Sequence, residues 1–281
     1  MSRAASTSRR ARSGACAWLV GLAATSAAAQ DLPLWEIGAG VGGLLMPHYR
    51  GAAQSQAWVL PLPWFVYRGE ILRADRDGAR ARLAGGERWD VDLSLSAAPP
   101  TRSKDNDARS GMADLPATLE LGPNLNARLA QGAGWKMDLR LPLRAAFTLE
   151  RNPRAVGWVA HPHLNVDHVV HGWNLGVMWG PVFGNRRYHA HFYDVGAAEA
   201  TDTRPVYSAR GGAAGWQGTL ALSRRFDRHW LGMFVRADSV AGAVFEPSPL
   251  VRQRTTVAYG LAWSWVWTQS DQRVSDPDAR R

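Results

Sequence analysis

The stretch Trp135–Glu150, WKMDLRLPLRAAFTLE, decides the fold class. Its odd-numbered residues are all apolar, whereas its even-numbered residues include Lys136, Asp138, Arg140 and Arg144. Because successive side chains of a strand point to opposite faces, the stretch has one apolar face and one charged face. It is longer than the roughly 5–6 residues of most soluble strands and long enough for the roughly 9–11 residues that cross a membrane. The pattern predicts a transmembrane β-strand whose apolar face meets lipid.

The same alternation recurs along the chain, in residues 35–45, 89–96, 117–129, 156–169, 173–183, 216–225, 229–238 and 255–267. Two further segments depart from it. Pro61 and Pro63 each remove a ladder donor and predict a bent or irregular strand. The short, polar hairpin around Asp77-Gly78 is expected to project beyond the bilayer. We therefore predict an all-β protein, a transmembrane antiparallel β-barrel of about 12 strands (range 10–14, an even number), or ten if that hairpin stands clear of the wall.

The ends of the chain divide it into three parts. Residues 1–29 have a basic start, an apolar run from Ala15 to Ala24 and the small residues Ala27–Ala29, which together predict a cleaved signal peptide. Residues 30–267 form the predicted barrel, and residues 268–281 a polar C-terminal tail without a pattern. The apolar run is too short to span a bilayer. Cys16, the one cysteine, lies in the predicted leader, so we expect no disulfide framework in the mature chain.

The charge of the chain does not favour nucleic acid as a partner. Removing the four leader arginines from the formal net charge of +9 leaves 29 basic against 24 acidic residues. Nucleic-acid binding normally shows as a clustered basic stripe. Here the basic residues alternate with apolar ones or lie beside acids, as in Arg73–Asp77. The 14 tryptophans instead suit the aromatic girdles of a membrane barrel.

The candidate site is a charged row that the alternation directs into the lumen. Its members lie on two neighbouring predicted strands: Lys136, Asp138, Arg140, Arg144, His161, His163 and Asp167. A metal site is the competing interpretation, because His161, His163 and Asp167 share one face. A single strand spaces them along a line, which is poor for a tetrahedral shell. We therefore favour a polar lumen row, with no metal and no cofactor.

Enzymatic activity and permeation are the two alternatives to a binding role. The chain holds the residue types of a hydrolytic triad, for example Asp167, His168 and Ser208, but no spacing singles out a nucleophile and no Gly-x-Ser-x-Gly motif occurs. We expect that the protein is not an enzyme. A diffusion pore is the stronger alternative to a binding role. Barrels of 8 strands are filled by side chains, and those of 16–18 strands leave an aqueous channel. Twelve strands lie between these limits, so a narrow or gated pore stays open as an alternative.

Five short motifs carry a resemblance to a known family. They are Pro47–Gly51, Leu60–Gly69, Asp105–Arg109 with Gly111-Met112, Gly180–Gly184 with Arg187-Tyr188-His189, and Ser248–Val251. Their order over Trp35 to Trp267 resembles the MipA/OmpV proteins (MltA-interacting protein) of the Gram-negative outer membrane.

The resemblance implies an outer-membrane β-barrel that acts as a scaffold or adaptor, as in the founding member, which links a murein lytic transglycosylase to a peptidoglycan synthase. The resemblance implies no catalytic residues. The expected location is the cell outer membrane, and the expected partners are its lipid and murein enzymes. Family members tend to stop at the strand that here ends on Trp267, whereas this chain continues for residues 268–281.

Overall fold

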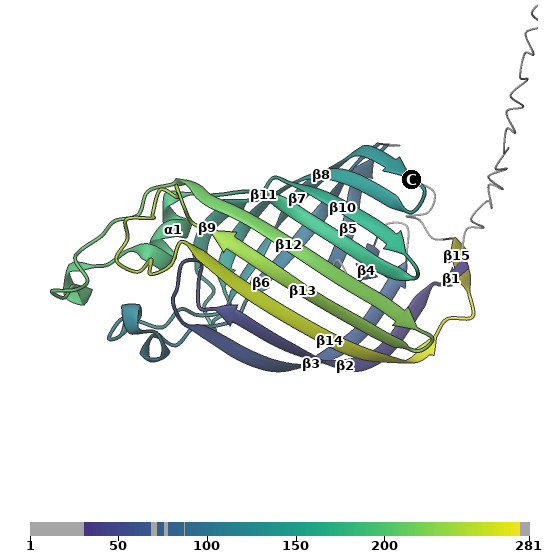
Figure 1. Ribbon diagram of the computed structural model, residues 1–281, viewed down its shortest axis with the longest axis horizontal. Helices are drawn as coiled ribbons and strands as arrows, with labels where there is room; N and C mark the ends of the chain where they lie inside the picture. The colour runs from purple at the N-terminus through teal and green to yellow at the C-terminus, as the bar shows by residue number, and fades with distance from the viewer. Residues whose placement is uncertain (1–30, 69–71, 76–77, 87, 276–281) are drawn as a thin grey trace, which may run out of the picture.

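The structure is a computed structural model that describes residues 31–68, 72–75, 78–86 and 88–275. Within these residues an antiparallel sheet closes on itself into a barrel, which confirms the predicted class (Figure 1). Its strands are β2 (Trp35–Pro47), β3 (Ser55–Arg68), β4 (Leu72–Asp75), β5 (Gly78–Gly85), β6 (Trp89–Ala98), β7 (Thr118–Gly132), β8 (Trp135–Thr148), β9 (Ala155–Ala160), β10 (His163–Val170), β11 (Trp173–Gly184), β12 (Gly212–Phe226), β13 (His229–Ser239) and β14 (Thr255–Gln269).

The 13 strands of the sheet occupy twelve positions in the wall. β9 and β10 are two parts of one interrupted strand, because both lie between β8 and β11 and pair with each of them. His161 and Pro162 separate the two parts. The predicted count of about twelve is therefore confirmed, and β8 covers all but two residues of the stretch that predicts the fold.

Apolar side chains cover the outer surface of the barrel, as the alternation predicts. Leu141, Leu143, Leu261 and Trp263 are among the large apolar residues that remain exposed. Exposed tryptophans gather near both ends of the strands: Trp89, Trp135, Trp265 and Trp267 at one end, Trp158, Trp179 and Trp216 at the other. Two aromatic girdles of this kind mark the two interfaces of a membrane barrel.

The prolines of β3 do not disturb its ladder with β2. All 13 residue pairs from Trp35↔Tyr67 to Pro47↔Ser55 follow one another without a register shift, so the expectation of an irregular strand was wrong for its pairing with β2. Antiparallel pairs alternate between bonded and non-bonded, and proline fits the non-bonded ones. Arg68 N donates to Leu34 O at 2.8 Å at one end, and His48 N donates to Gln54 O at 3.1 Å at the other. The bonded positions of this ladder are therefore the even-numbered residues of β3, and Pro61 and Pro63 fall between them.

The short hairpin is part of the wall and does not stand clear of it. β4 pairs with β3, and β5 pairs with both β4 and β6. The expectation of a projecting hairpin was therefore wrong for the described residues. Its strands are nevertheless short, and β4 meets β3 through only Tyr67 and Arg68.

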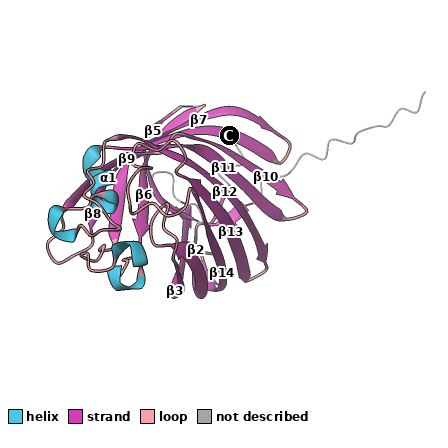
Figure 2. Ribbon diagram, turned by 60° about the vertical axis from the view of Figure 1, so that its left-hand side comes forward, coloured by secondary structure: helices cyan, strands magenta, loops and turns pink. Residues whose placement is uncertain are grey.

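The two ends of the barrel differ. At the turn end, β7 and β8, β10 and β11, and β12 and β13 are joined by short connections. At the other end, the loop end, long connections pack together with helix α1 (Arg186–Tyr193) and the 3-10 helices η1 (Ser103–Asp105), η2 (Asp107–Arg109) and η3 (Ala197–Glu199), as Figure 2 shows. Among the described residues no helix is long and apolar enough to cross a membrane.

Both ends of the described chain lie at the turn end. β1 (Asp31–Pro33) and β15 (Arg273–Ser275) pair with each other in a small sheet beside the barrel (Figure 1). β14 continues to Gln269, so regular structure extends past the predicted strand end at Trp267 and into the region expected to be a tail without a pattern. The predicted leader, residues 1–29, lies outside the described residues.

The faces of β8 make a direct test of this arrangement. Leu141 pairs with Leu125 of β7 on the outer face. Leu141→Arg should sharply reduce the yield of inserted, heat-modifiable barrel on gels, because an arginine facing lipid near the bilayer centre costs roughly 2–4 kcal/mol. Arg140→Leu, one residue away on the opposite face, is the matched control and should insert far better. Equal losses in both variants would contradict the face assignment.

Candidate functional site

Charged and amide side chains gather on one half of the barrel interior, on β6, β7, β8 and β10. The register aligns them across the wall: Arg140 of β8 lies between Asn126 of β7 and His163 of β10. These side chains lie on the face opposite the exposed leucines and are largely buried. We call this set the charged wall: Asp90, Asp92, Asn124, Asn126, Arg128, Lys136, Asp138, Arg140, Asn165 and Asp167.

Ion pairs link the charged wall across strand boundaries. Arg140 lies 4.0 Å from Asp138 and 3.9 Å from Asp167, and Lys136 lies 3.8 Å from Asp167. Arg128 also pairs with Asp138. A buried charge is tolerated only where partners surround it, and here Asp138 and Asp167 each meet at least one cation. This network joins β7, β8 and β10 on their inner face.

Amide groups extend the network toward β6. Asn126 donates to Asp90 at 2.7 Å and to Asp92 at 2.9 Å, and Asn124 donates to Asp92 at 3.1 Å. On the other side Asn165 donates to Asp167 at 2.8 Å. Amides supply donors to these carboxylates without adding charge.

The structure brings the sequence-predicted row together only in part. Lys136, Asp138, Arg140 and Asp167 form one group within the charged wall. His161 and His163 pack against each other with ring centroids 4.7 Å apart, and His163 Nδ1 lies 2.6 Å from the carbonyl oxygen of His161. Arg144 lies outside the first group and lines the same cavity as His161. In the described part of the chain, no cluster of three His, Cys, Asp or Glu side chains suits a metal ion.

Arg144 connects the wall to the loop end. It lies 3.2 Å from Glu120 and also donates to Ser94 at 3.2 Å. Glu120 accepts a 2.9 Å hydrogen bond from the hydroxyl of Tyr188 on α1. Burial and the adjacent Glu120 carboxylate raise the pKa of Tyr188 well above its ordinary value, so its hydroxyl stays protonated as a donor. Arg144 and Glu120 therefore fasten α1 to the barrel wall.

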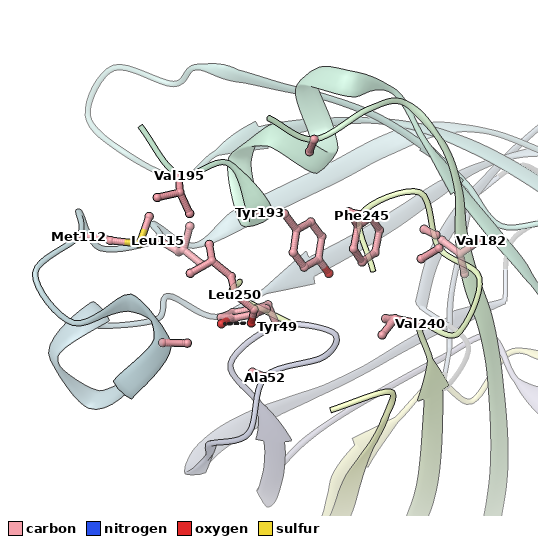
Figure 3. Packing of buried hydrophobic residues seen from close by; sticks show 14 of the residues in the cluster. Tyr49, Ala52, Met112, Leu115, Val182, Tyr193, Val195, Val240, Phe245 and Leu250 are labelled. Carbon is pink, nitrogen blue, oxygen red and sulfur yellow. Dashed lines mark hydrogen bonds between the residues drawn. The ribbon is translucent and has the colours of Figure 1, made fainter. Parts of the chain in front are cut away.

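A packed core closes the loop end, and we call it the cap. The rings of Tyr193 and Phe245 stack with centroids 3.7 Å apart, and Val195, Leu250 and Tyr49 surround them (Figure 3). The cluster draws on four long connections and on α1. Apolar packing of this kind normally forms the interior of a globular domain, so the long connections behave as a small folded unit seated on the barrel.

Buried polar groups lock the cap together. Tyr49 donates to Leu250 O and Tyr193 donates to Arg50 O, each at 2.8 Å. Arg204, only 6% exposed, donates to the carbonyl groups of Ala108, Ser110 and Glu199 in the neighbouring connections. Arg50 reaches down from the cap to Asp238 of β13 at 3.2 Å, which fastens the opposite side of the barrel.

A cavity of about 200 Å³ lies beneath the cap. Its lining includes Arg50, Glu120, Arg144, His161 and Asp238, the residues that connect cap and wall. Among the described residues the Nε2 atoms of His161 and His189 are buried without a hydrogen-bond partner. A polar cavity of this size has room for ordered water, which normally serves such atoms.

The structure also gathers a charged cluster that the sequence analysis did not single out. Glu36 of β2 is 1% exposed and pairs with Arg68 of β3 at 2.9 Å and with Arg225 of β12. The inward register of Glu36 was predictable from the alternation. Its pairing with Arg225 was not, because these residues lie on strands that are not neighbours in the wall. The cluster spans the interior at the turn end.

The candidate triad residues are not brought together. Ser208 lies in the cap, where Arg186 donates to its hydroxyl at 2.7 Å. His168 lies near the turn end of β10, two residues from the turn that leads into β11. Asp167 and His168 are successive strand residues and point to opposite faces. This arrangement does not build a nucleophile with an adjacent base.

Comparison with known protein families shows which family this chain belongs to. The sequence profile described as MltA-interacting protein MipA matches residues 39–267, which is most of the chain. The chain belongs to the MipA family. The match covers the wall from β2 to β14 together with the cap, and it confirms the family resemblance that the sequence motifs carry.

Solved structures with a similar arrangement are outer-membrane proteins. An outer membrane channel from Pseudomonas putida F1 is 12% identical, with a TM-score of 0.47, and the similarity covers 85% of this chain and 98% of that one. Outer membrane phospholipase A from Escherichia coli is 10% identical, with a TM-score of 0.33, over 84% and 94% of the two chains. The toluene transporter TodX from P. putida is 12% identical, with a TM-score of 0.30, over 85% and 68%. No curated protein sequence matches the chain.

Loss of the Arg144 side chain should destabilise the cap and leave the barrel folded. Arg144→Ala removes the cation beside Glu120, so α1 should loosen and the cap should be cut several times faster by added protease in intact cells. Arg140→Ala removes an equal charge from the charged wall and is the control, because its partners do not touch α1. Equal protection of the cap in the two variants would contradict the fastening role of Arg144.

Acid should weaken the cap. Burial, with nearby Arg109 and Arg154, lowers the pKa of His191 to about 4 from its ordinary 6.5, although Glu150 partly opposes this shift. Burial also lowers the pKa of His48, whose Nδ1 accepts a 3.0 Å hydrogen bond from the amide of Asn106, although nearby Asp105 partly opposes this shift. The folded cap thus binds fewer protons than the unfolded one, so its stability is complete above pH 6.5 and falls as the pH drops toward about 4.

Hydrogen exchange of α1, corrected for the intrinsic effect of pH, measures this dependence. Protection should fall between pH 7 and pH 4.5 in the unmodified chain and fall less in His191→Gln. Equal protection of α1 at both pH values would contradict the prediction that protonation of these histidines destabilises the cap.

Proposed function

We propose that this outer-membrane β-barrel is a scaffold that binds murein enzymes in the periplasm, among them a lytic transglycosylase, and that it also contacts a peptidoglycan synthase. The observation that carries the proposal is the family match over residues 39–267, whose description names an interaction with MltA. The proposal assigns the chain no catalytic step, and the charged wall then has a structural role.

The closed interior supports a binding role over a wide channel. The cap seals the loop end with packed side chains, and the charged wall and the Glu36 cluster fill much of the section below it. Barrels that conduct freely leave a water-filled lumen. A protein that acts by binding needs only a stable wall and an accessible surface.

The turn end is the surface that we propose for the partner. Short turns of outer-membrane barrels face the periplasm, where murein lies. β1 and β15 stand beside the wall at this end, and in the described residues each pairs only with the other (Figure 1). An exposed strand edge offers backbone donors and acceptors to an added strand, a common mode of peptide recognition.

Crosslinking in intact cell envelopes, followed by identification of the attached proteins, tests the scaffold. The unmodified chain should capture a murein hydrolase or synthase. Val274→Pro, which removes a backbone donor from the middle of β15, should lower that capture at least severalfold while the barrel keeps its heat-modifiable mobility. Val206→Pro in the cap is the matched control and should capture as well as the unmodified chain. Failure to recover any murein enzyme would overturn the proposal.

A narrow, gated pore is the second candidate, and the polar half of the interior favours it. If charges close the passage, replacing Arg140 and Arg144 together by alanine should raise small-solute leakage in liposomes while the barrel remains folded. If the native protein conducts in planar bilayers, the same pair should shift its preference from anions toward cations. Unchanged leakage and unchanged selectivity would count against both forms of the pore.

A further inference from the structure

The half of the interior opposite the charged wall is apolar midway along the strands, between the Glu36 cluster at the turn end and Asp238 at the loop end. β3 is apolar on both faces: Ala57, Val59 and Phe65 alternate with Trp58, Leu60, Leu62 and Trp64. The even-numbered residues of β3 pair with the inward glycines of β2, and β13 and β14 add Phe234, Gly260 and Ala262. Small or apolar inward residues over several neighbouring strands are unusual in a barrel whose interior is polar by default.

This half lines a partly open cavity of about 370 Å³. Leu44, Leu62, Ala221 and Phe234 are among its lining residues, and Asp167 and Ser223 form a polar margin. Small-molecule sites in proteins are mostly apolar and have volumes of roughly 300–1,000 Å³ with a few polar groups that fix orientation. The cap does not reach this space, and of the charged wall only Asp167 borders it.

Two inward glycines keep the cavity open. A Cβ atom at Gly232 would collide with the ring of Trp230, and one at Gly260 would collide with the ring of Phe234. The rings therefore lie against the glycine backbone along the wall. Trp230 also packs on Trp64 of β3 with centroids 5.2 Å apart. The aromatic side chains thus line the cavity and do not fill it.

The cavity adjoins a seam in the barrel wall. In the described part of the chain, β3 residues 55–63 have a strand partner only on the β2 side, because β4 reaches β3 only at Tyr67 and Arg68. On the far flank of the hairpin, residues 93–98 of β6 pair only with β7. Leu60 lines the cavity from the seam strand and is 42% exposed despite its inward register.

The prolines keep this edge from being paired. The odd-numbered residues of β3 direct their backbone groups away from β2 and toward the seam, and two of them are Pro61 and Pro63. Proline has no N–H to offer a further strand, so strand addition is disfavoured at these two positions of the edge. A seam in the wall of a membrane barrel joins the lumen, whose water can serve the unpaired backbone groups, to the surrounding lipid.

We propose that the apolar half of the lumen is a binding site for a single hydrocarbon chain, which reaches it from the bilayer through the seam beside β3. The occupant is a molecule that carries an alkyl or acyl chain, either a membrane phospholipid or a free fatty acid. Such a chain leaves one apolar surrounding for another, so no water shell must be removed. Its polar head lies at the margin, where the amide of Asn174 and the hydroxyl of Ser223 can donate to it. The proposal is independent of the scaffold role.

Photocrosslinking in nanodiscs tests this site. The full barrel is reconstituted in phosphatidylethanolamine and phosphatidylglycerol with a phospholipid whose acyl chain bears a diazirine, or with a diazirine fatty acid added to unlabelled lipid. After irradiation, adducts are mapped by mass spectrometry. The unmodified chain should give adducts at inward Leu62 and Phe234 as well as at outward Val59. The arm that labels the inward residues identifies the source of the chain.

Filling the cavity should remove only the inward adducts. Ala221→Phe places a ring between Gly176 and Phe234, and inward labelling should fall at least tenfold. Gly176→Leu is a second filling variant, since a Cβ there meets nothing closer than Asp167 Oδ1 at 3.4 Å. Leu220→Phe, the neighbouring residue on the outer face, is the control and should label like the unmodified chain. Adducts at outward residues only, or inward adducts that persist in both filling variants, would overturn the proposal.

Discussion

The structure depends on one constraint, which is that backbone polar groups within a membrane must find partners inside the protein. β14 returns to pair with β2, and β8 pairs with both parts of the interrupted strand β9–β10, so the sheet closes. The exception lies at β3, where the described residues leave one edge without a strand. There the sequence places Pro61 and Pro63, which remove donors from the side that has no partner.

The interior is divided between two kinds of surface with different consequences. Ion pairs and amide hydrogen bonds on β6, β7, β8 and β10 hold neighbouring strands together and, through Arg144 and Glu120, hold the cap. The opposite half has small and apolar residues that leave space. A barrel with both halves charged would fill with crossing side chains, whereas one with both halves apolar would lack the groups that fasten its cap. The division lets one wall serve stability and the other receive a ligand.

The sequence predicted the parts of the fold that depend on local pattern. The alternation in β8 and β14 identifies strands and faces, because a period of two is imposed by the pleat itself. The same pattern placed Lys136, Asp138 and Arg140 on one face, and the structure brings these three together with Asp167. It misjudged the hairpin β4–β5, whose short and polar strands resemble a projecting loop until their pairing with β3 and β6 is known.

Features that depend on distant contacts could not be predicted in this way. The cap joins Tyr49, Tyr193 and Phe245, and no local pattern indicates that these connections share a core. The partner of Glu36 on β12 is equally remote in sequence. The effect of Pro61 and Pro63 on the sheet could not be predicted either. A missing backbone donor disrupts the sheet on the side where a strand is paired and does no harm on the side where none is.

Residue-resolved amide hydrogen exchange of the barrel in nanodiscs, followed by NMR, tests most directly whether one edge of β3 lacks a strand partner. Amides bonded to β2 are protected, whereas amides that face the seam exchange once water reaches them. The account predicts an alternation along β3, with slow exchange at Trp58, Leu60 and Leu62 and fast exchange at Ala57 and Val59. Uniformly slow exchange at all five positions would show that both edges of β3 are paired and would contradict the seam.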